Sequence, residues 1–271
     1  MAAADELDPS GSVLTFYATE FRRDRARIGM TQRAMAKRAL MAPSLLNKIE
    51  SAKRLPTEDL SRLADELYGT GDRYQRLWRL VIRYAFPAWF RPFIELEEVA
   101  SIIKSFEVQV VPGLLQTERY ARAILAAGRL DLAELDEQVT ARLQRQRIFE
   151  RQDPPDFRAV LDENVIRRVW GDADIMREQL ERLLALAELP RFVIQVIPLE
   201  SGGHAGVGGP FAALTLDEGP DVVYVDGFLQ GQILAAPTDV RAAQRTYDLL
   251  AAEALSPTRS IELIVSALKE L

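Results

Sequence analysis

The segment TQRAMAKRALMAPSLLNKIESAKRLP, residues 31–56, constrains the fold of this chain most strongly. Thr31 carries a hydroxyl that can accept from the free amides of a first helical turn, so it predicts the start of a short helix. Pro43 suits the first position of a second helix, because its missing N–H is not needed there and its φ is already helical. The segment therefore predicts two short helices joined by a tight turn.

The second helix is expected over residues 43–51, with one apolar and one polar face. At helical spacing, Leu46 and Ile49 point inward. The outward residues are polar: Ser44, Asn47 and Lys48. Two short helices, a tight turn and an outward polar edge make a helix-turn-helix, whose second helix enters the major groove of DNA.

Eight polar residues of this segment are candidates for contact with DNA. Side chains of the second helix can exchange hydrogen bonds with base edges, and the positive end of the first helix favours phosphate. The basic residues after the second helix can clamp the DNA backbone. The candidates are Thr31, Gln32, Arg33, Ser44, Asn47, Lys48, Lys53 and Arg54. The alternative interpretation is a solvated polar face on an ordinary helical pair.

The segment resembles the Cro/lambda-repressor-like, or XRE-type, helix-turn-helix family. The residues that carry the resemblance are Thr31-Gln32, the small residue Ala36, the pair Ile49-Glu50, and Arg54 with Pro56. The resemblance implies a double-stranded DNA operator as partner. Because operators for this motif commonly contain two half-sites, we expect a homodimer.

Three positions depart from the family pattern. Leu40 stands where the turn glycine is usual, Ala42 where the second helix usually has a Ser or Thr cap, and Ala52 where a glycine usually follows. Alanine is a poor cap because its side chain has no acceptor. Pro43 offers no side-chain hydrogen bond to a base. Specificity is therefore expected to rest on Asn47, Lys48 and DNA shape.

The net charge of −6 at pH 7 conceals a strong asymmetry along the 271-residue chain. Residues 15–85 contain 15 Lys/Arg and 8 Asp/Glu, a balance of +7. The other residues contain 19 and 32, a balance of −13. A basic module on an acidic body indicates local binding of phosphate.

Composition excludes several kinds of site. The chain has no cysteine and a single histidine, which excludes thiolate metal sites and zinc sites built on imidazoles. We therefore expect no metal and no cofactor. The acidic start MAAADELDPSGS is not a signal peptide, and no apolar stretch approaches the length of a membrane span. We expect a cytoplasmic protein with no membrane partner.

The predicted fold class is α+β, with an all-α five-helix domain followed by an α+β domain that contains an antiparallel sheet. The expected organisation is a disordered tail at 1–12, the helix-turn-helix domain at 13–86, a joint at 87–92 and an α+β regulatory domain at 93–271. Apolar spacing predicts the outer helices of the first domain over residues 13–28, after Thr57 and after Gly71. Gly29 is expected to cap the first of them.

Apolar periodicity divides the second domain into helices and strands. Helices are expected at 95–104, 118–128, 134–151, 173–189, 237–255 and 257–270. Strands are expected at 106–110, in FRAVLD before a short helix, in RFVIQVIP, and in PFAALTL, DVVYV and FLQGQIL. The last three are expected to form an antiparallel meander, with Asp226-Gly227 as a two-residue hairpin turn.

The second domain resembles the uncharacterised regulatory domain of WhiJ-like, antitoxin-like transcriptional regulators of actinobacteria. The resemblance covers nearly the whole chain in order. It is carried by segments such as FEVQVVPGLLQTERYARAIL, VLDENVIRR, QLERLLALAELPRFVIQVIP and GGHAGVGGPFAALTLDEGPDVVYVD. It implies a transcriptional regulator that is often encoded beside a small partner protein.

The segment SGGHAGVGGPF surrounds the single histidine, His204, with five glycines. No Lys-Ser or Lys-Thr follows it, as a phosphate-binding P-loop needs, and its spacing is not G-x-G-x-x-G. We favour a mobile loop with an exposed His204 over a pH-sensitive contact. The adjacent side chains of Asp162 and Glu163 diverge, so they favour a helix N-terminus rather than acid–base catalysis. We expect the chain not to be an enzyme.

Two functional hypotheses follow. In the first, the chain is a sequence-specific DNA-binding transcriptional regulator whose second domain binds a small partner protein. In the second, that domain senses a small-molecule ligand that shifts DNA affinity. Candidate ligand or partner residues are Tyr120, Trp170, His204, Phe211 and Tyr224. The alternative interpretation of the aromatic residues is an ordinary core.

Overall fold

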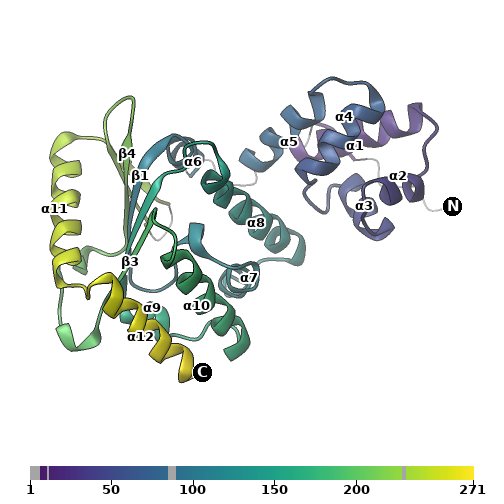
Figure 1. Ribbon diagram of the computed structural model, residues 1–271. Helices are drawn as coiled ribbons and strands as arrows, with labels where there is room; N and C mark the ends of the chain where they lie inside the picture. Colours follow the sequence, from purple (N-terminus) through teal and green to yellow (C-terminus); the bar gives the residue numbers. More distant parts are fainter. Residues whose placement is uncertain (1–6, 11, 85–89, 228–229) are drawn as a thin grey trace. The chain divides into compact units, whose positions relative to one another are not determined.

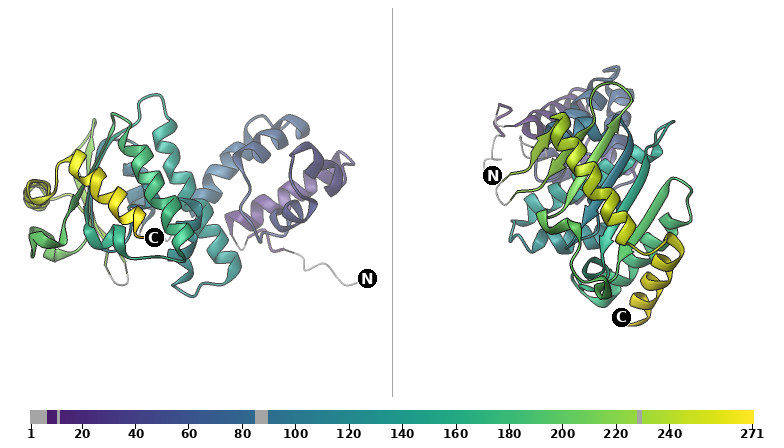
Figure 2. Two further views of the ribbon diagram at one scale, coloured as in Figure 1. Left: turned by 60° about the horizontal axis from the view of Figure 1, so that its bottom comes forward. Right: turned by 90° about the vertical axis from the view of Figure 1, so that its left-hand side faces the viewer.

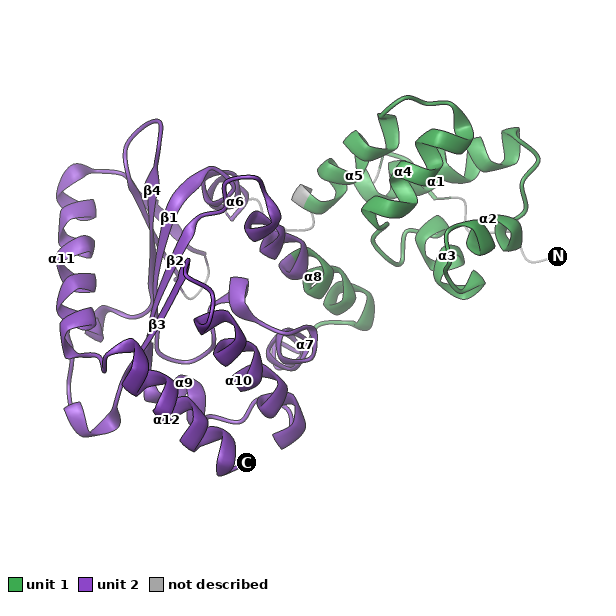
Figure 3. Ribbon diagram, viewed as in Figure 1, with its two compact units in different colours: residues 1–87, 130–141 green, residues 88–129, 142–271 purple. Residues whose placement is uncertain are grey.

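The computed structural model describes residues 7–10, 12–84, 90–227 and 230–271. It divides into two compact units, residues 1–87 with 130–141 and residues 88–129 with 142–271 (Figure 3). We call them the N-terminal unit and the C-terminal unit. Among the helices of the described residues, none has the length and apolar character that crossing a membrane requires.

Five helices build the body of the N-terminal unit (Figure 1). They are α1 (Val13–Arg27), α2 (Gln32–Arg38), α3 (Pro43–Glu50), α4 (Glu58–Tyr68) and α5 (Arg73–Tyr84). The predicted helix ends are confirmed. The hydroxyls of Thr31 and Thr57 accept from backbone amides three residues on. Pro43 occupies the first turn of α3, and Gly29 follows α1 in left-handed backbone, with φ of 68°.

An aromatic cluster forms the core of the N-terminal unit. Tyr17 and Phe21 of α1 stack with ring centroids 5.9 Å apart, and Tyr74 of α5 meets them edge-on at 5.4 and 5.8 Å. Leu46 and Ile49 of α3 are buried in the same core, as their spacing predicted. Burial of each such side chain contributes roughly 2 kcal/mol, so the inner face of the helix-turn-helix is held mainly by packing.

A six-stranded sheet forms the centre of the C-terminal unit, in the order β3-β2-β1-β4-β5-β6. The strands are β1 (Ala100–Glu107), β2 (Asp156–Asp162), β3 (Phe192–Ile197), β4 (Phe211–Leu216), β5 (Val222–Val225) and β6 (Gln232–Leu234). β1, β2 and β3 pair in parallel, whereas β4, β5 and β6 add to β1 as an antiparallel meander. The α+β class and the meander are therefore confirmed.

Two details of the sheet differ from the prediction. Residues 100–104, predicted as the end of a helix, belong to β1, and the helix α6 covers only Arg91–Glu97. β1 lies between two neighbouring strands, and such pairing decides the structure of short apolar runs that periodicity leaves ambiguous. The predicted two-residue turn at 226–227 is also wrong, because the sheet register pairs Val225 with Gln232.

Helices cover both faces of the sheet (Figures 1 and 2). α11 (Pro237–Glu253) lies along one face, over a core that includes Phe106 and Val160. α10 (Ala173–Ala187) and α12 (Pro257–Lys269) lie along the other, over a core that includes Ile103 and Leu161. Side chains alternate along a strand, so each strand contributes to both cores.

The remaining helices are α7 (Glu118–Ala126), α8 (Leu132–Arg145) and α9 (Glu163–Arg167). The predicted helix at 134–151 changes after α8 into a 3₁₀ turn, η2 (Gln146–Glu150). Asp162 caps α9 by accepting from the amide of Asn164 at 2.8 Å, as the carboxylate pair predicted. Parts of the predicted tail, joint and last strand, at 1–6, 11, 87–89 and 228–229, lie outside the described residues.

Candidate nucleic-acid interface

The polar residues of α3 lie on its outer face. Ser44, Asn47 and Lys48 are all exposed, whereas the apolar face of the same helix is buried. The N-cap residue of α3, Ala42, offers no side-chain cap. Pro43 has no N–H and the Leu45 and Leu46 amides donate to the Ala42 carbonyl, so the Ser44 amide is the one of the first turn that is left for an outside acceptor. An exposed polar face beside an uncapped N-terminus suits contact with base edges and phosphate.

Glu50, at the end of α3, joins the three helices that define the motif. Its side chain is 1 % exposed and accepts from Arg25 Nε at 2.5 Å and from Arg25 Nη2 at 2.8 Å. It also accepts from Gln32 Nε2 at 2.7 Å. The hydrogen bonds to Glu50 raise the pKa of Arg25. A single buried carboxylate thus links α1, α2 and α3.

Gln32 therefore makes other contacts than the predicted one with DNA phosphate. Its side chain is half-buried and donates to Glu50, with a longer contact of 3.4 Å to Asn47 Oδ1. The family pattern included Glu50, but nothing local in the sequence indicated its pairing with Arg25, 25 residues away. Gln32 acts in this structure as a link between α2 and α3.

The other predicted phosphate contacts differ in their exposure. Thr31 caps α2, and Arg33 and Lys53 are exposed. Arg54 Nη1 lies 2.5 Å from Asp136 Oδ2 within the N-terminal unit, and the Arg54 side chain is 27 % exposed. Arg33 and Lys53 therefore present their charges to solvent, whereas Arg54 is engaged in an ion pair.

Leu40 and Ala52 both adopt left-handed backbone, with φ of 52° and 55°. These are the two positions at which the sequence departs from an expected glycine. Cβ crowds a carbonyl oxygen in this conformation, at a cost of roughly 1 kcal/mol for each residue. Leu40 is 94 % exposed, so burial of its side chain does not offset that cost. The motif keeps its turn geometry without the usual glycines.

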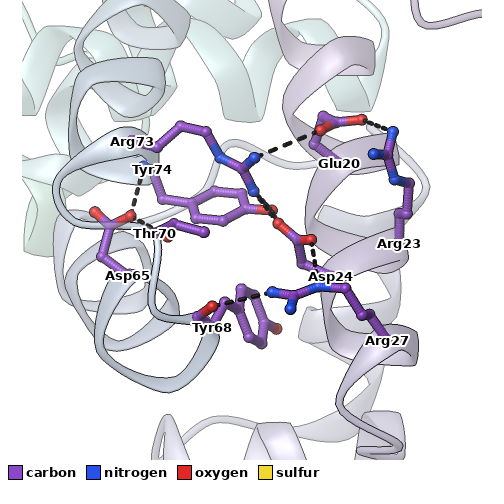
Figure 4. A network of polar contacts seen from close by, with 9 residues as sticks. All are labelled: Glu20, Arg23, Asp24, Arg27, Asp65, Tyr68, Thr70, Arg73 and Tyr74. Carbon is purple, nitrogen blue, oxygen red and sulfur yellow. Dashed lines mark hydrogen bonds and ion pairs between the residues drawn. The ribbon is translucent and has the colours of Figure 1, made fainter.

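A second buried polar network ties α1, α4 and α5 together (Figure 4). Asp65 of α4 accepts from the amides of Tyr74 at 2.8 Å and Gln75 at 3.0 Å, so a side chain from another helix caps α5. Asp24 of α1 accepts from Tyr74 Oη at 2.8 Å and from Arg73. Burial raises the pKa of Tyr74 and keeps its hydroxyl a donor. The network supports the helices that carry the helix-turn-helix.

The C-terminal unit contains a polar cluster at the end of β1 that sequence analysis missed. Glu107, the last residue of β1, accepts from Ser105 Oγ at 3.1 Å. Arg142 of α8 donates from Nη1 to Gln116 Oε1 at 3.0 Å. The residues come from different parts of the chain, so no local motif could have indicated the cluster.

Burial shifts the ionisation of both charged groups in this cluster. It raises the pKa of Glu107 to about 8, with nearby Asp226 raising it further and Arg142 lowering it. Burial also lowers the pKa of Arg142 to about 10, and the neighbouring Arg145 lowers it too. Arg145 itself makes a bidentate pair with Glu97 at 2.8 and 2.9 Å. Perturbed charges of this kind are typical of functional sites.

Two known families match different parts of the chain. Residues 17–77 match a helix-turn-helix domain, and residues 90–266, more than half of the chain, match a domain of unknown function (DUF5753). The chain belongs to the DUF5753 family. No curated protein and no solved structure was found to match it. The helix-turn-helix domain identifies a DNA-binding regulator. The match to DUF5753 does not show what the C-terminal domain binds.

Several of the predicted ligand or partner residues belong to the core of the DUF5753 domain. Tyr120 is fully buried, and its hydroxyl accepts from the amide of Val111 at 3.2 Å. Burial raises the pKa of Tyr120 to about 12. Phe211 packs in the core beneath α11. Trp170 is half-buried and donates to the carbonyl of Gln109 at 3.4 Å.

Tyr224 is the predicted residue that the structure brings to the polar cluster. It is 5 % exposed, and its ring stacks on Phe93 with centroids 4.3 Å apart. Its hydroxyl donates to Asp226 Oδ1 at 2.5 Å. Asp226 in turn faces Glu107 and Arg142 closely enough to shift the pKa of both. Tyr224 thus positions one carboxylate of the cluster.

His204 is not the exposed loop residue that the sequence suggested. Its side chain is 14 % exposed, and Nε2 lies 3.2 Å from Asp162 Oδ2. The Gly206 amide donates to Nδ1 at 3.1 Å, so Nε2 is the nitrogen that donates to Asp162. These contacts anchor the glycine-rich loop to the end of β2. Within the described residues, no group of three or more His, Asp or Glu side chains is placed to hold a metal ion.

Proposed function

We propose that the chain is a sequence-specific transcriptional regulator that reads an operator in double-stranded DNA through α3. The observation that carries this proposal is the exposed polar face formed by Ser44, Asn47 and Lys48. An Asn side chain can pair with adenine, and a Lys side chain can reach guanine or phosphate. The resemblance of residues 31–56 to Cro/lambda-repressor-like proteins supports the same function.

The test is binding to DNA upstream of the chain's own gene, at several salt concentrations and with competitor DNA. Asn47→Ala combined with Lys48→Ala should abolish competitor-resistant binding without unfolding the chain, because both residues are exposed. Arg62→Ala, which removes a 67 % exposed cation from α4, is the matched control. Full affinity in the double variant would refute the proposal. Binding that falls steeply with salt for any DNA sequence would reduce the role of α3 to phosphate contact.

A homodimer is part of the same proposal, because operators of this motif commonly contain two half-sites. Sedimentation of the chain with and without operator DNA tests it. Two chains on each operator are expected, and one chain on a full-affinity operator would contradict it.

For the DUF5753 domain, we propose binding of a small partner protein encoded nearby, as the resemblance to WhiJ-like, antitoxin-like actinobacterial regulators implies. Exposed apolar side chains support this. Val207 is 93 % exposed on the 3₁₀ turn η4 (Ala205–Gly208), which packs against α11, and Leu249 of α11 is 47 % exposed. Co-expression with the product of the adjacent small gene should yield a complex that Val207→Ser weakens. Absence of a complex would remove this proposal.

A second candidate function is the sensing of a small molecule that shifts DNA affinity. It is favoured by the ionisable side chains of Glu107 and Arg142, whose direct hydrogen-bond partners are neutral. Neither proposal includes catalysis, since His204 contacts Asp162 and a backbone amide rather than a nucleophile.

A further inference from the structure

Glu107 and Arg142 are an acid and a base in one cluster, yet they do not pair. Among the described residues, Glu107 accepts only from Ser105, and Arg142 donates only to Gln116. Each nevertheless shifts the pKa of the other, so the two charges lie within range of one another. Buried charges are expensive unless a counter-charge compensates them, and burial accordingly raises the pKa of Glu107 to about 8, so that it keeps its proton at neutral pH in the free chain. The cluster is therefore suited to receive compensating charges from a bound molecule.

Arg142 is oriented for this role by a fixed neighbour. Gln116 is 2 % exposed and donates from Nε2 to the carbonyl of Val111 at 2.6 Å. Its Oε1 accepts a hydrogen bond from Nη1 of Arg142, which fixes the orientation of the guanidinium. Nε and Nη2 of Arg142 have no hydrogen-bond partner among the described residues, and the side chain keeps accessible surface. These are the donors that recognise a carboxylate in bidentate geometry.

Glu107 and Asp226 supply acceptors at the same place. One oxygen of Glu107 accepts from Ser105, and one oxygen of Asp226 accepts from Tyr224. The register of β1, β4 and β5 puts the C-terminal ends of β1 and β5 at the same end of the sheet. In the part of the chain that the structure describes, the second oxygen of each carboxylate has no partner. The helix that carries Arg142 reaches these two acceptors, because Arg145, one turn further along α8, lies over the Phe90 ring and Phe90 packs against Tyr224.

We propose that Glu107, Gln116, Arg142 and Asp226 form a binding site for a small zwitterion of the α-amino acid class. The ligand carboxylate would pair with Arg142, and its ammonium group would be held by Glu107 and Asp226. This inference deepens the second candidate function, ligand sensing, but the binding itself does not depend on DNA. We call these four residues the zwitterion site.

The balance of charges favours a zwitterion over a single ion. Arg145 is already paired with Glu97, so Arg142 is the cation that faces Glu107 and Asp226. An inorganic anion would gain Arg142 but be repelled by Asp226 and would leave Glu107 without a cation. A simple cation would gain the carboxylates but be repelled by Arg142. α-Amino acids are the smallest molecules that carry both charges on one carbon atom, so they satisfy both sides of the site.

The test is calorimetric titration of the full chain with each proteinogenic L-amino acid. Acetate, inorganic phosphate and methylammonium serve as probes that carry one charge. At least one amino acid should bind, and each single-charge probe should bind about tenfold more weakly or worse, because it loses one charged contact.

Three variants decide whether binding uses the proposed residues. Arg142→Met and Glu107→Gln should each weaken amino-acid binding by about tenfold or more. The first removes the cation that pairs with the ligand carboxylate, and the second removes the carboxyl group that ionises when the ligand ammonium binds. Arg241→Met, which removes an exposed cation from α11, should leave binding unchanged. Glu107→Gln keeps the shape of the side chain, so it remains informative if Arg142→Met does not fold.

Three results would overturn the proposal: no amino acid binds, phosphate or acetate binds equally well, or the foldable site variants bind like the unmodified chain. Operator affinity measured with and without the bound amino acid then tests the proposed sensing. Binding without any change in DNA affinity would keep the zwitterion site and refute ligand sensing.

Discussion

Glu50 accepts two hydrogen bonds from Arg25, at 2.5 and 2.8 Å, so a buried ion pair ties the end of α3 to α1. Gln32 of α2 donates to the same carboxylate at 2.7 Å. The outer face of α3 is therefore oriented by a residue that points inward. Removing one partner of such a pair leaves the other as an uncompensated buried charge.

Glu50→Ala should lower the free energy of unfolding of the N-terminal unit by about 3 kcal/mol, because Arg25 would keep a half-buried charge without its partner. Denaturant titration followed by circular dichroism measures this loss. The control is Asp59→Ala, which removes an 85 % exposed partner of Arg62 and should cost less than about 1 kcal/mol. Equal losses in the two variants would contradict the role given to Glu50.

Leu40→Gly and Ala52→Gly should each stabilise the N-terminal unit by about 0.5 kcal/mol. Relief of left-handed strain is worth roughly 1 kcal/mol or more, and the greater entropy of unfolded glycine cancels only part of it. Gly29→Ala is the reciprocal control, since φ is 68° there and an added Cβ would meet no atom within 4 Å. Its melting temperature should fall while those of the other two variants rise. A lower melting temperature for Leu40→Gly would show that its backbone is not strained.

The helix-turn-helix could be predicted because its signals are local. Thr31 and Thr57 cap helices within three residues, and Leu46 and Ile49 repeat at helical spacing. The links between the helices could not be predicted in the same way. Glu50 meets Arg25 only after packing has formed, and the preceding sequence offers many other arginines.

The C-terminal unit shows the same limit more clearly. The meander of β4 to β6 follows from apolar runs and turn residues, but the parallel pairing of β1 with β2 joins segments about 50 residues apart. For this reason the local pattern predicts a helix at the start of β1. Glu107, Arg142 and Asp226 come from distant segments, and no local pattern in the sequence brings them together. Their chemistry becomes visible only in the folded chain.

Asp65→Ala should destabilise the start of α5 by about 2 kcal/mol, because two backbone amides and the Thr70 hydroxyl lose a buried acceptor. Hydrogen exchange at the amides of Tyr74 and Gln75 should quicken. The control is Asp72→Ala, which removes a 67 % exposed carboxylate just before the same helix. If both variants quicken exchange equally, Asp65 is not the cap of α5.

The stability of the C-terminal unit should depend on pH through Glu107. Burial raises the pKa of Glu107 from 4.5 to about 8 in the folded chain. As pH rises between these values, the unfolded chain releases this proton while the folded chain retains it, so the free energy of unfolding falls. Above about pH 8 both states are ionised, and the loss reaches its full extent.

Glu107→Gln removes the titrating carboxyl group and should therefore stabilise the C-terminal unit above about pH 5. The gain in the free energy of unfolding should grow up to about pH 8. The gain should be on the order of 3 kcal/mol at most, because each pKa unit is worth about 1.4 kcal/mol and local relaxation relieves part of the shift. Denaturant titrations of both chains at pH 5, 7 and 8.5 measure it. Glu200→Gln, which changes an exposed carboxylate in the 3₁₀ turn η3 (Leu199–Ser201), is the control and should leave the pH dependence unchanged. A carboxylate that lowers stability at neutral pH fits a residue placed for binding rather than for folding. If the stability gained by Glu107→Gln over the unmodified chain is no larger at pH 8.5 than at pH 5, that assignment is refuted.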